Sequence, residues 1–222
     1  MMLRIGHRGA RGHAPENTLA AIEKGIALHS HMIEFDLQHT RDGQLVLLHD
    51  ATLDRTTNGH GRIAELTWED ARRLKVGGNQ PLPLLADALR VASGRAGVMI
   101  ELKAEGIARE TVRIVQESRF SGPVVYGSFL HDQLLEIRRA QPQAHTLALI
   151  EAIPVNRTAF ATDAQATHVG VAFNTLTAPF LGALHAKSLR VFVYTVNEPA
   201  DIRAAKAMGV DGIISDYPDR LM

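Results

Sequence analysis

The sequence contains no cysteine, and this absence excludes several kinds of site at once. Disulfide frameworks, thiolate metal sites and cysteine nucleophiles all need that residue. The chain also has no apolar run that approaches the ~18 residues of a membrane-spanning helix. Its N-terminal segment lacks the apolar stretch of ~7–15 residues that a secretory signal carries, so we expect a cytoplasmic protein.

Neither sign of charge is in excess, since 24 lysines and arginines balance 24 aspartates and glutamates. Such a chain has no broad electrostatic field for DNA, RNA or an anionic membrane. The basic run that ends at Lys75 has no interleaved aromatic residues and is typical of a solvated helix face. We therefore expect a small-molecule substrate, no nucleic-acid partner and no stable membrane association. The sequence favours neither a monomer nor a homo-oligomer.

Short apolar runs alternate with longer stretches of helical period along the 222 residues. This alternation predicts an α/β fold with a parallel sheet, either closed into an eight-stranded barrel or open and doubly wound. We treat residues 1–222 as a single domain, because barrels often run to ~250 residues as one unit. Strands are predicted over 3–6, 32–37, 44–49, 97–103, 123–129, 146–151, 168–173, 190–196 and 211–216. Helices are predicted over 17–29, 68–74, 107–118, 131–140, 176–188 and 198–209.

Nine predicted strands are one too many for an eight-stranded barrel. The surplus lies in the pair 32–37 and 44–49, because the linker QHTRDG is far shorter than the dozen or so residues that a parallel crossover usually needs. A hairpin at Asp42 and Gly43 and an unusual crossover without a helix both satisfy the sequence. The stretch 51–83, rich in Thr, Gly and Asn, is predicted to be a short surface excursion, and long loops in compact domains are often functional.

Reactive side chains occur at the carboxyl ends of the first four predicted strands: His7 and Arg8, Glu34 and Asp36, His49 and Asp50, and Glu101 and Lys103. In parallel α/β proteins, active sites are built at that end of the sheet. Residues two apart on a strand share a face, so the side chains of Glu34 and Asp36 point the same way, and so do those of Glu101 and Lys103. Independent structural accidents would rarely bring four such groups to one edge, which favours a common site.

Three carboxylates of this group lie on otherwise apolar strands: Glu34, Asp36 and Glu101. Burying them is costly unless something positive lies among them. Without cysteine, such oxygen ligands suit Mg²⁺ or Ca²⁺ better than zinc. Taken singly, each feature has a plainer interpretation: a solvated acidic pair, a structural ion pair of Glu101 with Lys103, a packed histidine or a capping arginine.

The loop after the first strand, GHRGARGHAPENT, combines glycines with several reactive residues. We expect Gly6 and Gly9 to let the backbone approach the site closely. Asn17 is predicted to cap the helix that follows. Arg11 and His13 are expected at the periphery, because no strand directs them at the carboxylates, and the other histidines outside the four strand ends are expected to be surface or packing residues.

Seven blocks of the sequence occur in one order: HRGARGHAPENT, EFDLQHTRDGQLVLLHD, TLDRTTNGHG, IELK, YGSF, YTVN and GVDGIISDYP. In these blocks the chain resembles the glycerophosphodiester phosphodiesterases, from Ile5 to Pro218. The resemblance implies a (β/α)8 TIM-type barrel, a single domain with a short irregular excursion after the third strand. The chain departs from the family pattern in two ways: Tyr194 stands where tryptophan is common, and the excursion is short. Both departures concern the rim of the substrate site.

The resemblance also implies an activity, the metal-dependent hydrolysis of glycerophosphodiesters to glycerol 3-phosphate and an alcohol. The implied roles are acid/base catalysis by His7 and His49, phosphate contacts by Arg8 and Lys103, and one divalent cation, Mg²⁺ or Ca²⁺, held by Glu34, Asp36 and Glu101. The residues permit either histidine as the acid, and either water or the neighbouring glycerol hydroxyl as the nucleophile. The alternatives are a phosphodiesterase acting on lysophospholipids and a non-catalytic phosphodiester-binding barrel.

Overall fold

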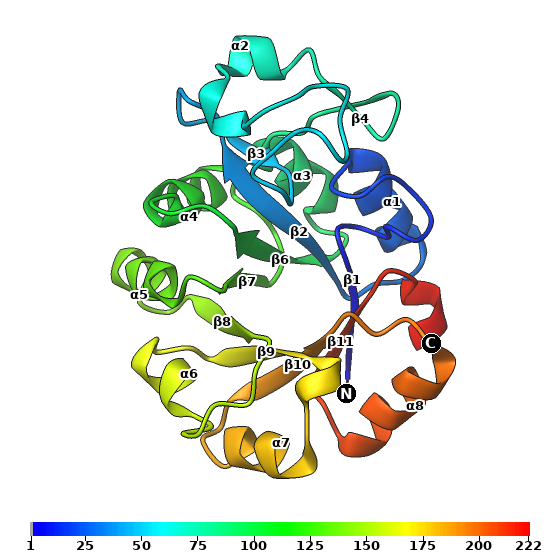
Figure 1. Cartoon of the computed structure of the whole chain (residues 1–222), viewed down its shortest axis with the longest axis vertical. Helices are drawn as coiled ribbons and strands as arrows, with labels where there is room; N and C mark the ends of the chain where they lie inside the picture. Colours follow the sequence, from blue (N-terminus) through cyan, green and yellow to red (C-terminus); the bar gives the residue numbers. More distant parts are fainter. Residues whose placement is uncertain (1) are drawn as a thin grey trace.

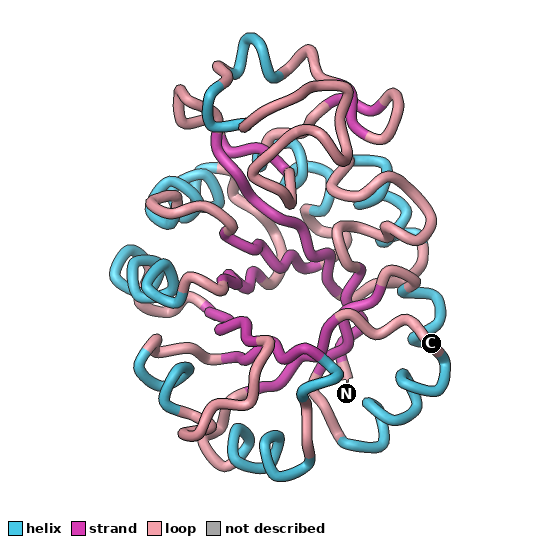
Figure 2. The backbone as a smooth tube through the Cα atoms, viewed as in Figure 1, coloured by secondary structure: helices cyan, strands magenta, loops and turns pink. Residues whose placement is uncertain are grey.

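Eight parallel strands close into a barrel, which Figures 1 and 2 show end-on. The structure is a computed structural model that describes residues 2–222. Around the barrel the strands follow the order β1, β2, β6, β7, β8, β9, β10 and β11, and β1 pairs with both β2 and β11. They span Leu3–Gly6, Met32–His39, Gly97–Leu102, Val124–Ser128, His145–Ile150, His168–Ala172, Arg190–Tyr194 and Gly212–Ser215. The predicted (β/α)8 barrel is confirmed.

Helices cover the outside of the barrel (Figure 1). The α-helices are α1 (Leu19–Ala27), α2 (Trp68–Ala71), α3 (Leu85–Ala92), α4 (Ala108–Glu117), α5 (His131–Ala140), α6 (Ala159–Asp163), α7 (Ala178–His185) and α8 (Pro199–Met208). Short 3-10 helices span Ile63–Glu65 (η1), Phe173–Thr175 (η2) and Pro218–Leu221 (η3). Helices α3 and α6 were not predicted from the sequence. None of the helices in the described part of the chain combines the length and the apolar character that crossing a membrane requires.

The strands are apolar because both of their faces are buried. Inward-facing residues, among them Ile5, Met99 and Phe192, pack into the barrel interior. Outward-facing residues such as Ile33 and Ile100 pack in a second layer against the helices. A parallel sheet covered on both faces produces such runs, without the polar alternation of a half-exposed sheet. The carboxylates on these strands are therefore exceptions to their surroundings.

The surplus strand forms a hairpin. Strand β3 (Leu45–Leu47) runs antiparallel to β2, with Leu37 opposite Leu47. The turn places Gly43 at φ +81°, in the left-handed region that favours glycine, and its N–H donates to the Thr40 carbonyl at 2.9 Å. Of the two alternatives left open for residues 32–49, the structure has the hairpin at Asp42 and Gly43. It turns back toward the barrel mouth and brings His49 there.

The stretch 51–83 lies beside the barrel rather than over it, at the end where β3 and α1 are found (Figure 1). It contains η1, α2 and a two-stranded ribbon of β4 (Lys75–Val76) and β5 (Gln80–Pro81). Its apolar residues form a small cluster of their own with β3, including Leu53, Ile63 and Val76. The predicted excursion is therefore a folded appendage with its own core.

The loop between β1 and α1 folds tightly against the barrel. A Cβ on Gly6 would lie 2.1 Å from the Gly9 carbonyl oxygen, and Gly9 itself adopts φ +91°. Both glycines thus permit a close approach of backbone, although the atoms approached belong to the loop itself and to α1 rather than to the site. The predicted cap is wrong, because the Thr18 side chain accepts from the Ala21 N–H at the start of α1. Asn17 is turned toward the barrel instead.

Candidate active site

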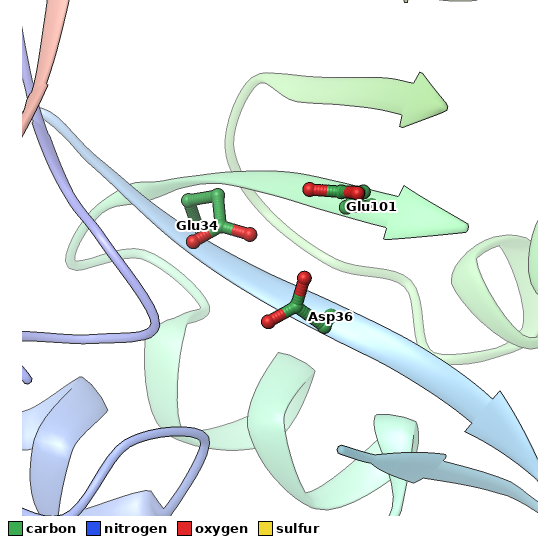
Figure 3. A group of neighbouring side chains, drawn as sticks. All are labelled: Glu34, Asp36 and Glu101. Carbon is green, nitrogen blue, oxygen red and sulfur yellow. The ribbon is translucent and has the colours of Figure 1, made fainter. Parts of the chain in front are cut away.

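Three carboxylates meet inside the barrel mouth, as Figure 3 shows. Glu34 and Asp36 lie on β2, and Glu101 lies opposite Asp36 on the neighbouring β6. Each offers an oxygen within 4.8 Å of the others. Their exposed fractions are only 2%, 1% and 9%. The spacing of two residues on β2 and the parallel register of β2 with β6 together produce this cluster.

Burial strengthens the repulsion between these three negative groups, because little water is present to screen their charges. Burial, followed by the charges of Asp36 and Glu101, raises the pKa of Glu34 well above its ordinary range. Burial and Asp36 raise the pKa of Glu101 to about 7. Glu34 Oε1 is buried and has no hydrogen-bond partner among the described residues. An all-oxygen cluster with an unpaired buried oxygen fits a hard divalent cation.

His7 approaches the cluster from the end of β1. Its Nδ1 lies 2.6 Å from Asp216 Oδ1, and its Nε2 lies 4.0 Å from Glu34 Oε2. An ionised carboxylate only accepts, so the pairing places a proton on Nδ1 and leaves Nε2 facing the cluster. Burial lowers the pKa of His7, although the hydrogen bond to Asp216 opposes this. Neutral imidazole is therefore favoured near pH 7.

His49 approaches from β3 with the same arrangement. Its Nδ1 lies 2.6 Å from Asp50 Oδ1, and its Nε2 accepts from Lys103 Nζ at 3.2 Å. Lys103 also donates to Glu101 Oε1 at 2.8 Å and lies 3.9 Å from Asp36 Oδ1. The ion pair between Glu101 and Lys103, considered above as a plain structural pair, thus lies inside the cluster and connects it to His49.

Arg8 closes the other side of the cluster. Its backbone N–H donates to Glu34 Oε2 at 2.7 Å, and its guanidinium pairs with Glu16 Oε1 at 2.6 Å. Arg8 Nε lies 3.4 Å from Asp36 Oδ2. The backbone of Arg8 adopts φ 49°, a conformation that costs a non-glycine residue free energy and that these contacts hold in place. All seven predicted site residues therefore lie together at the barrel mouth.

Several residues at this site were not predicted. Asp216 follows β11, and its other oxygen accepts from Asn197 Nδ2 at 2.8 Å. Asn17 donates to Asp36 Oδ2 at 2.8 Å and accepts from the Asp36 N–H at 3.1 Å. Arg11 lies nearer than expected, with Nε 3.3 Å from Asp216 Oδ1, whereas His13 pairs with Asp219 away from the cluster. The rule of carboxyl strand ends could have found Asp216, but no local pattern indicates the loop residues.

An aromatic pair borders the site on the side of β7 and β10. The rings of Phe129 and Tyr194 meet edge to face with centroids 6.2 Å apart. Lys103 Nζ lies 5.7 Å from the Phe129 ring centre, and the Tyr194 hydroxyl donates to the Ile150 carbonyl at 3.0 Å. Tyr194, which differs from the family's common tryptophan, is therefore a wall of the barrel mouth next to the cluster.

Comparisons with known proteins point to one family. The profile of the Glycerophosphoryl diester phosphodiesterase family matches residues 7–220. A glycerophosphodiester phosphodiesterase of Caldanaerobacter subterraneus subsp. tengcongensis is 29% identical over 98% of this chain and 95% of its own length.

Two solved structures have the same fold. An Oleispira antarctica phosphodiesterase in complex with the product sn-glycerol-3-phosphate has a TM-score of 0.91 at 26% identity, over 98% of this chain and 94% of that chain. A glycerophosphodiester phosphodiesterase from Agrobacterium tumefaciens has a TM-score of 0.86 at 27% identity, over 100% and 99% of the two chains. The match to the family profile spans nearly the whole chain and includes every residue of the cluster, so this protein belongs to the glycerophosphoryl diester phosphodiesterase family.

Proposed function

We propose that this protein hydrolyses glycerophosphodiesters to glycerol 3-phosphate and an alcohol, with His7 and His49 as the acid/base pair. One observation carries the proposal: two histidines, each paired with an aspartate through Nδ1, flank a buried cluster of three carboxylates. His7 Nε2 faces Glu34, and His49 Nε2 contacts the Lys103 ammonium that pairs with Glu101. The product bound by the Oleispira relative supports the choice of substrate.

The two histidines divide the proton transfers between them. Because burial lowers the pKa of His7, this imidazole is neutral near pH 7 and accepts the proton of the attacking hydroxyl at Nε2. For the acid role His49 takes a second proton from solvent at Nε2, which then releases Lys103 Nζ and donates that proton to the leaving alkoxide, since the alkoxide departs poorly without one. Asp216 and Asp50 hold the rings and stabilise their charged forms, as in other paired acid/base sites.

The phosphate is held by positive groups around the cluster. Arg8 and Lys103 approach it from opposite sides and neutralise charge that gathers on the phosphoryl oxygens. We assign Glu34, Asp36 and Glu101 as ligands of one divalent cation, Mg²⁺ or Ca²⁺, since all the donors are carboxylate oxygens. When bound, such a cation supplies Lewis-acid stabilisation of the phosphoryl group.

The proposal is tested by following glycerol 3-phosphate release from glycerophosphocholine. The protein is dialysed against EDTA, assayed, and assayed again after Mg²⁺ or Ca²⁺ is added back. We expect activity to disappear with the chelator and to return with at least one cation. Full activity in excess EDTA would contradict the cation assignment, and no release from any headgroup diester with either cation would contradict the proposed reaction.

Exposed apolar side chains at the barrel mouth favour a second candidate substrate, the lysophospholipids. Phe129, Ile153 and Val155 follow strands β7 and β8 and are 40%, 47% and 107% exposed. Large exposed apolar residues near a site provide a place for an acyl chain. Comparing kcat/KM for glycerophosphocholine and lysophosphatidylcholine separates the two substrates. Ile153→Ser and Val155→Ser should lower only the second value if the chain binds there.

A further inference from the structure

One arginine of the excursion contacts two carboxylates beside the active site. Arg55 Nε donates to Asp50 Oδ2 at 2.7 Å, and Nη2 donates to Asp50 Oδ1 at 3.2 Å. Arg55 Nη1 and Nη2 also donate to the two oxygens of Glu16, at 3.0 and 2.8 Å. The guanidinium therefore binds both carboxylates in the two-point geometry that lysine cannot reproduce.

Each of these carboxylates continues to a residue of the reaction centre. Asp50 Oδ1 accepts from His49 Nδ1 at 2.6 Å. Glu16 Oε1 accepts from Arg8 Nη1 at 2.6 Å. Arg55 thus lies one carboxylate away from the proposed proton donor and one carboxylate away from the proposed phosphate contact. It joins the β1 loop to the end of β3, two segments that are far apart in the sequence.

The excursion fixes this arginine firmly. Leu53 is completely buried in the cluster that the excursion forms with β3. Its N–H donates to the Gly61 carbonyl at 2.9 Å, and its carbonyl accepts from the Thr57 N–H at 3.0 Å. The turn that carries Arg55 is therefore attached to the same strand that delivers His49. Packing in the excursion sets the position of a guanidinium at the active site.

We propose that Arg55 is a positioning residue: it holds Asp50 in the orientation that directs His49 and, through Glu16, fixes Arg8 beside the phosphate. This inference rests on the proposed function. Asp50 is only partly buried, so its side chain has other rotamers available once the two-point contact is lost. A histidine whose Nδ1 partner moves loses both its tautomer and its ring orientation, which lowers catalysis without removing any reacting group.

The electrostatics agree with this role. The hydrogen bond from Arg55 is the main reason that the pKa of Asp50 lies well below its usual range. Burial alone would raise the pKa of Glu16, but Arg55 and Arg8 together lower it to about 2. Both carboxylates are therefore ionised throughout the range in which a histidine pair works, and His49 keeps a charged partner.

A direct contact of Arg55 with substrate is the competing role. A cavity of about 420 Å³ is lined by Arg55, Glu16 and Lys75, and the Arg55 side chain is 47% exposed. The two roles differ in kinetics, because a substrate contact made equally in the bound and transition states raises KM, whereas a positioning contact lowers kcat.

The test uses Arg55→Gln and Arg55→Lys, with Arg73→Gln as the matched control. Arg73 lies in the same excursion and pairs only with exposed Glu69 among the described residues, so its loss should leave kcat within about twofold. For Arg55→Gln we expect kcat for glycerophosphocholine to fall ~10–100-fold, as on loss of a residue that orients a reactive group, with KM within about threefold. Arg55→Lys should recover only part of the loss, and its folding is checked by thermal denaturation.

A double-mutant cycle identifies the route of the effect. Without His49 the route through Asp50 no longer contributes, so adding Arg55→Gln to His49→Ala should lower kcat by clearly less than the same change does in the wild type, through the remaining route by Glu16 and Arg8. An equal loss in both backgrounds, a rise of KM with unchanged kcat, or wild-type kinetics of Arg55→Gln would each overturn the inference. Wild-type turnover of His49→Ala alone is a different result, since it contradicts the proposed function rather than the role of Arg55.

Discussion

The carboxylate cluster should make the stability of the protein depend on pH in a way that a bound cation reverses. Burial and Asp36 raise the pKa of Glu101 from 4.5 to about 7. A carboxyl with a raised pKa stabilises the folded state below its unfolded pKa, and this stabilisation is lost as the pH rises through the folded pKa. The cation-free protein therefore loses stability between pH 5.5 and pH 8, while a cation that binds the ionised cluster restores it.

The size of the effect follows from the two pKa values. One pKa unit is worth about 1.4 kcal/mol, so the difference at Glu101 amounts to about 3 kcal/mol in full and about 2 kcal/mol between pH 5.5 and pH 8. Glu34, whose pKa is also raised, acts in the same direction. For a domain of this size, 2 kcal/mol corresponds to about 4–8 °C in Tm.

The assay compares Tm in EDTA with Tm in saturating Mg²⁺ or Ca²⁺ at both pH values. Pairing the two samples at each pH cancels the titration of every group remote from the cluster. We expect the gap between them to be wider at pH 8, and Glu101→Gln to raise Tm in EDTA at that pH and to reduce the gap. Glu105→Gln, an exposed neighbour, is the control. A gap that is absent, or that does not change with pH, would refute the reasoning.

Three further predictions concern the supports of the site and the barrel. Asp216→Asn should lower kcat ~10–100-fold with little change in KM, because His7 loses its charged Nδ1 partner. His168 is buried at the bottom of the barrel, and burial lowers its pKa to about 4, so protonation costs about 2 kcal/mol of stability between pH 7 and pH 5. His168→Leu should remove that loss. Gly9→Ala should cost about 3 kcal/mol or more, since its Cβ would meet backbone 2.4 Å away, whereas Gly43→Ala, in open space at a similar φ, should cost about 1 kcal/mol.

Each of these has a contradicting result. Steady-state kinetics of Asp216→Asn equal to wild type would remove the aspartate from the mechanism. Denaturation of His168→Leu with an unchanged pH dependence would show that another group causes the loss. Equal free energies of unfolding for the two glycine variants would mean that the close approach at Gly9 is not as tight as its geometry indicates.

Much of the barrel was predictable because burial on both faces leaves a strong mark on a sequence. An apolar run such as residues 32–37 indicates a strand whether its neighbours are parallel or antiparallel. The direction of β3 could not be decided from the sequence, since the six-residue linker allowed both a hairpin and an unusual crossover without a helix; the antiparallel pairing with β2 and the turn at Gly43 show the hairpin. Helix α3 was not singled out, because its run LADALRVA merges with the excursion before it.

Only some residues of the site could likewise be predicted from the sequence. Reactive residues at strand ends could be predicted, because one rule of parallel sheets brings those ends together. Residues that act from loops could not, and Asn17 is the clearest case: it reads as a helix cap, but its amide binds Asp36 instead. Arg55 and Glu16 lie in two of the blocks that resemble the family, but neither block indicates which side chains they contact, since their partners are set by how two loops meet in space.

The most direct test of the account is the turnover of His7→Ala and His49→Ala on glycerophosphocholine, with saturating cation and with folding verified by Tm. We predict that kcat for glycerol 3-phosphate release falls ~10²–10⁴-fold in each variant, the usual contribution of a positioned acid or base. A variant that folds and turns over at the wild-type rate would contradict the central claim, because its histidine would then have no part in the reaction.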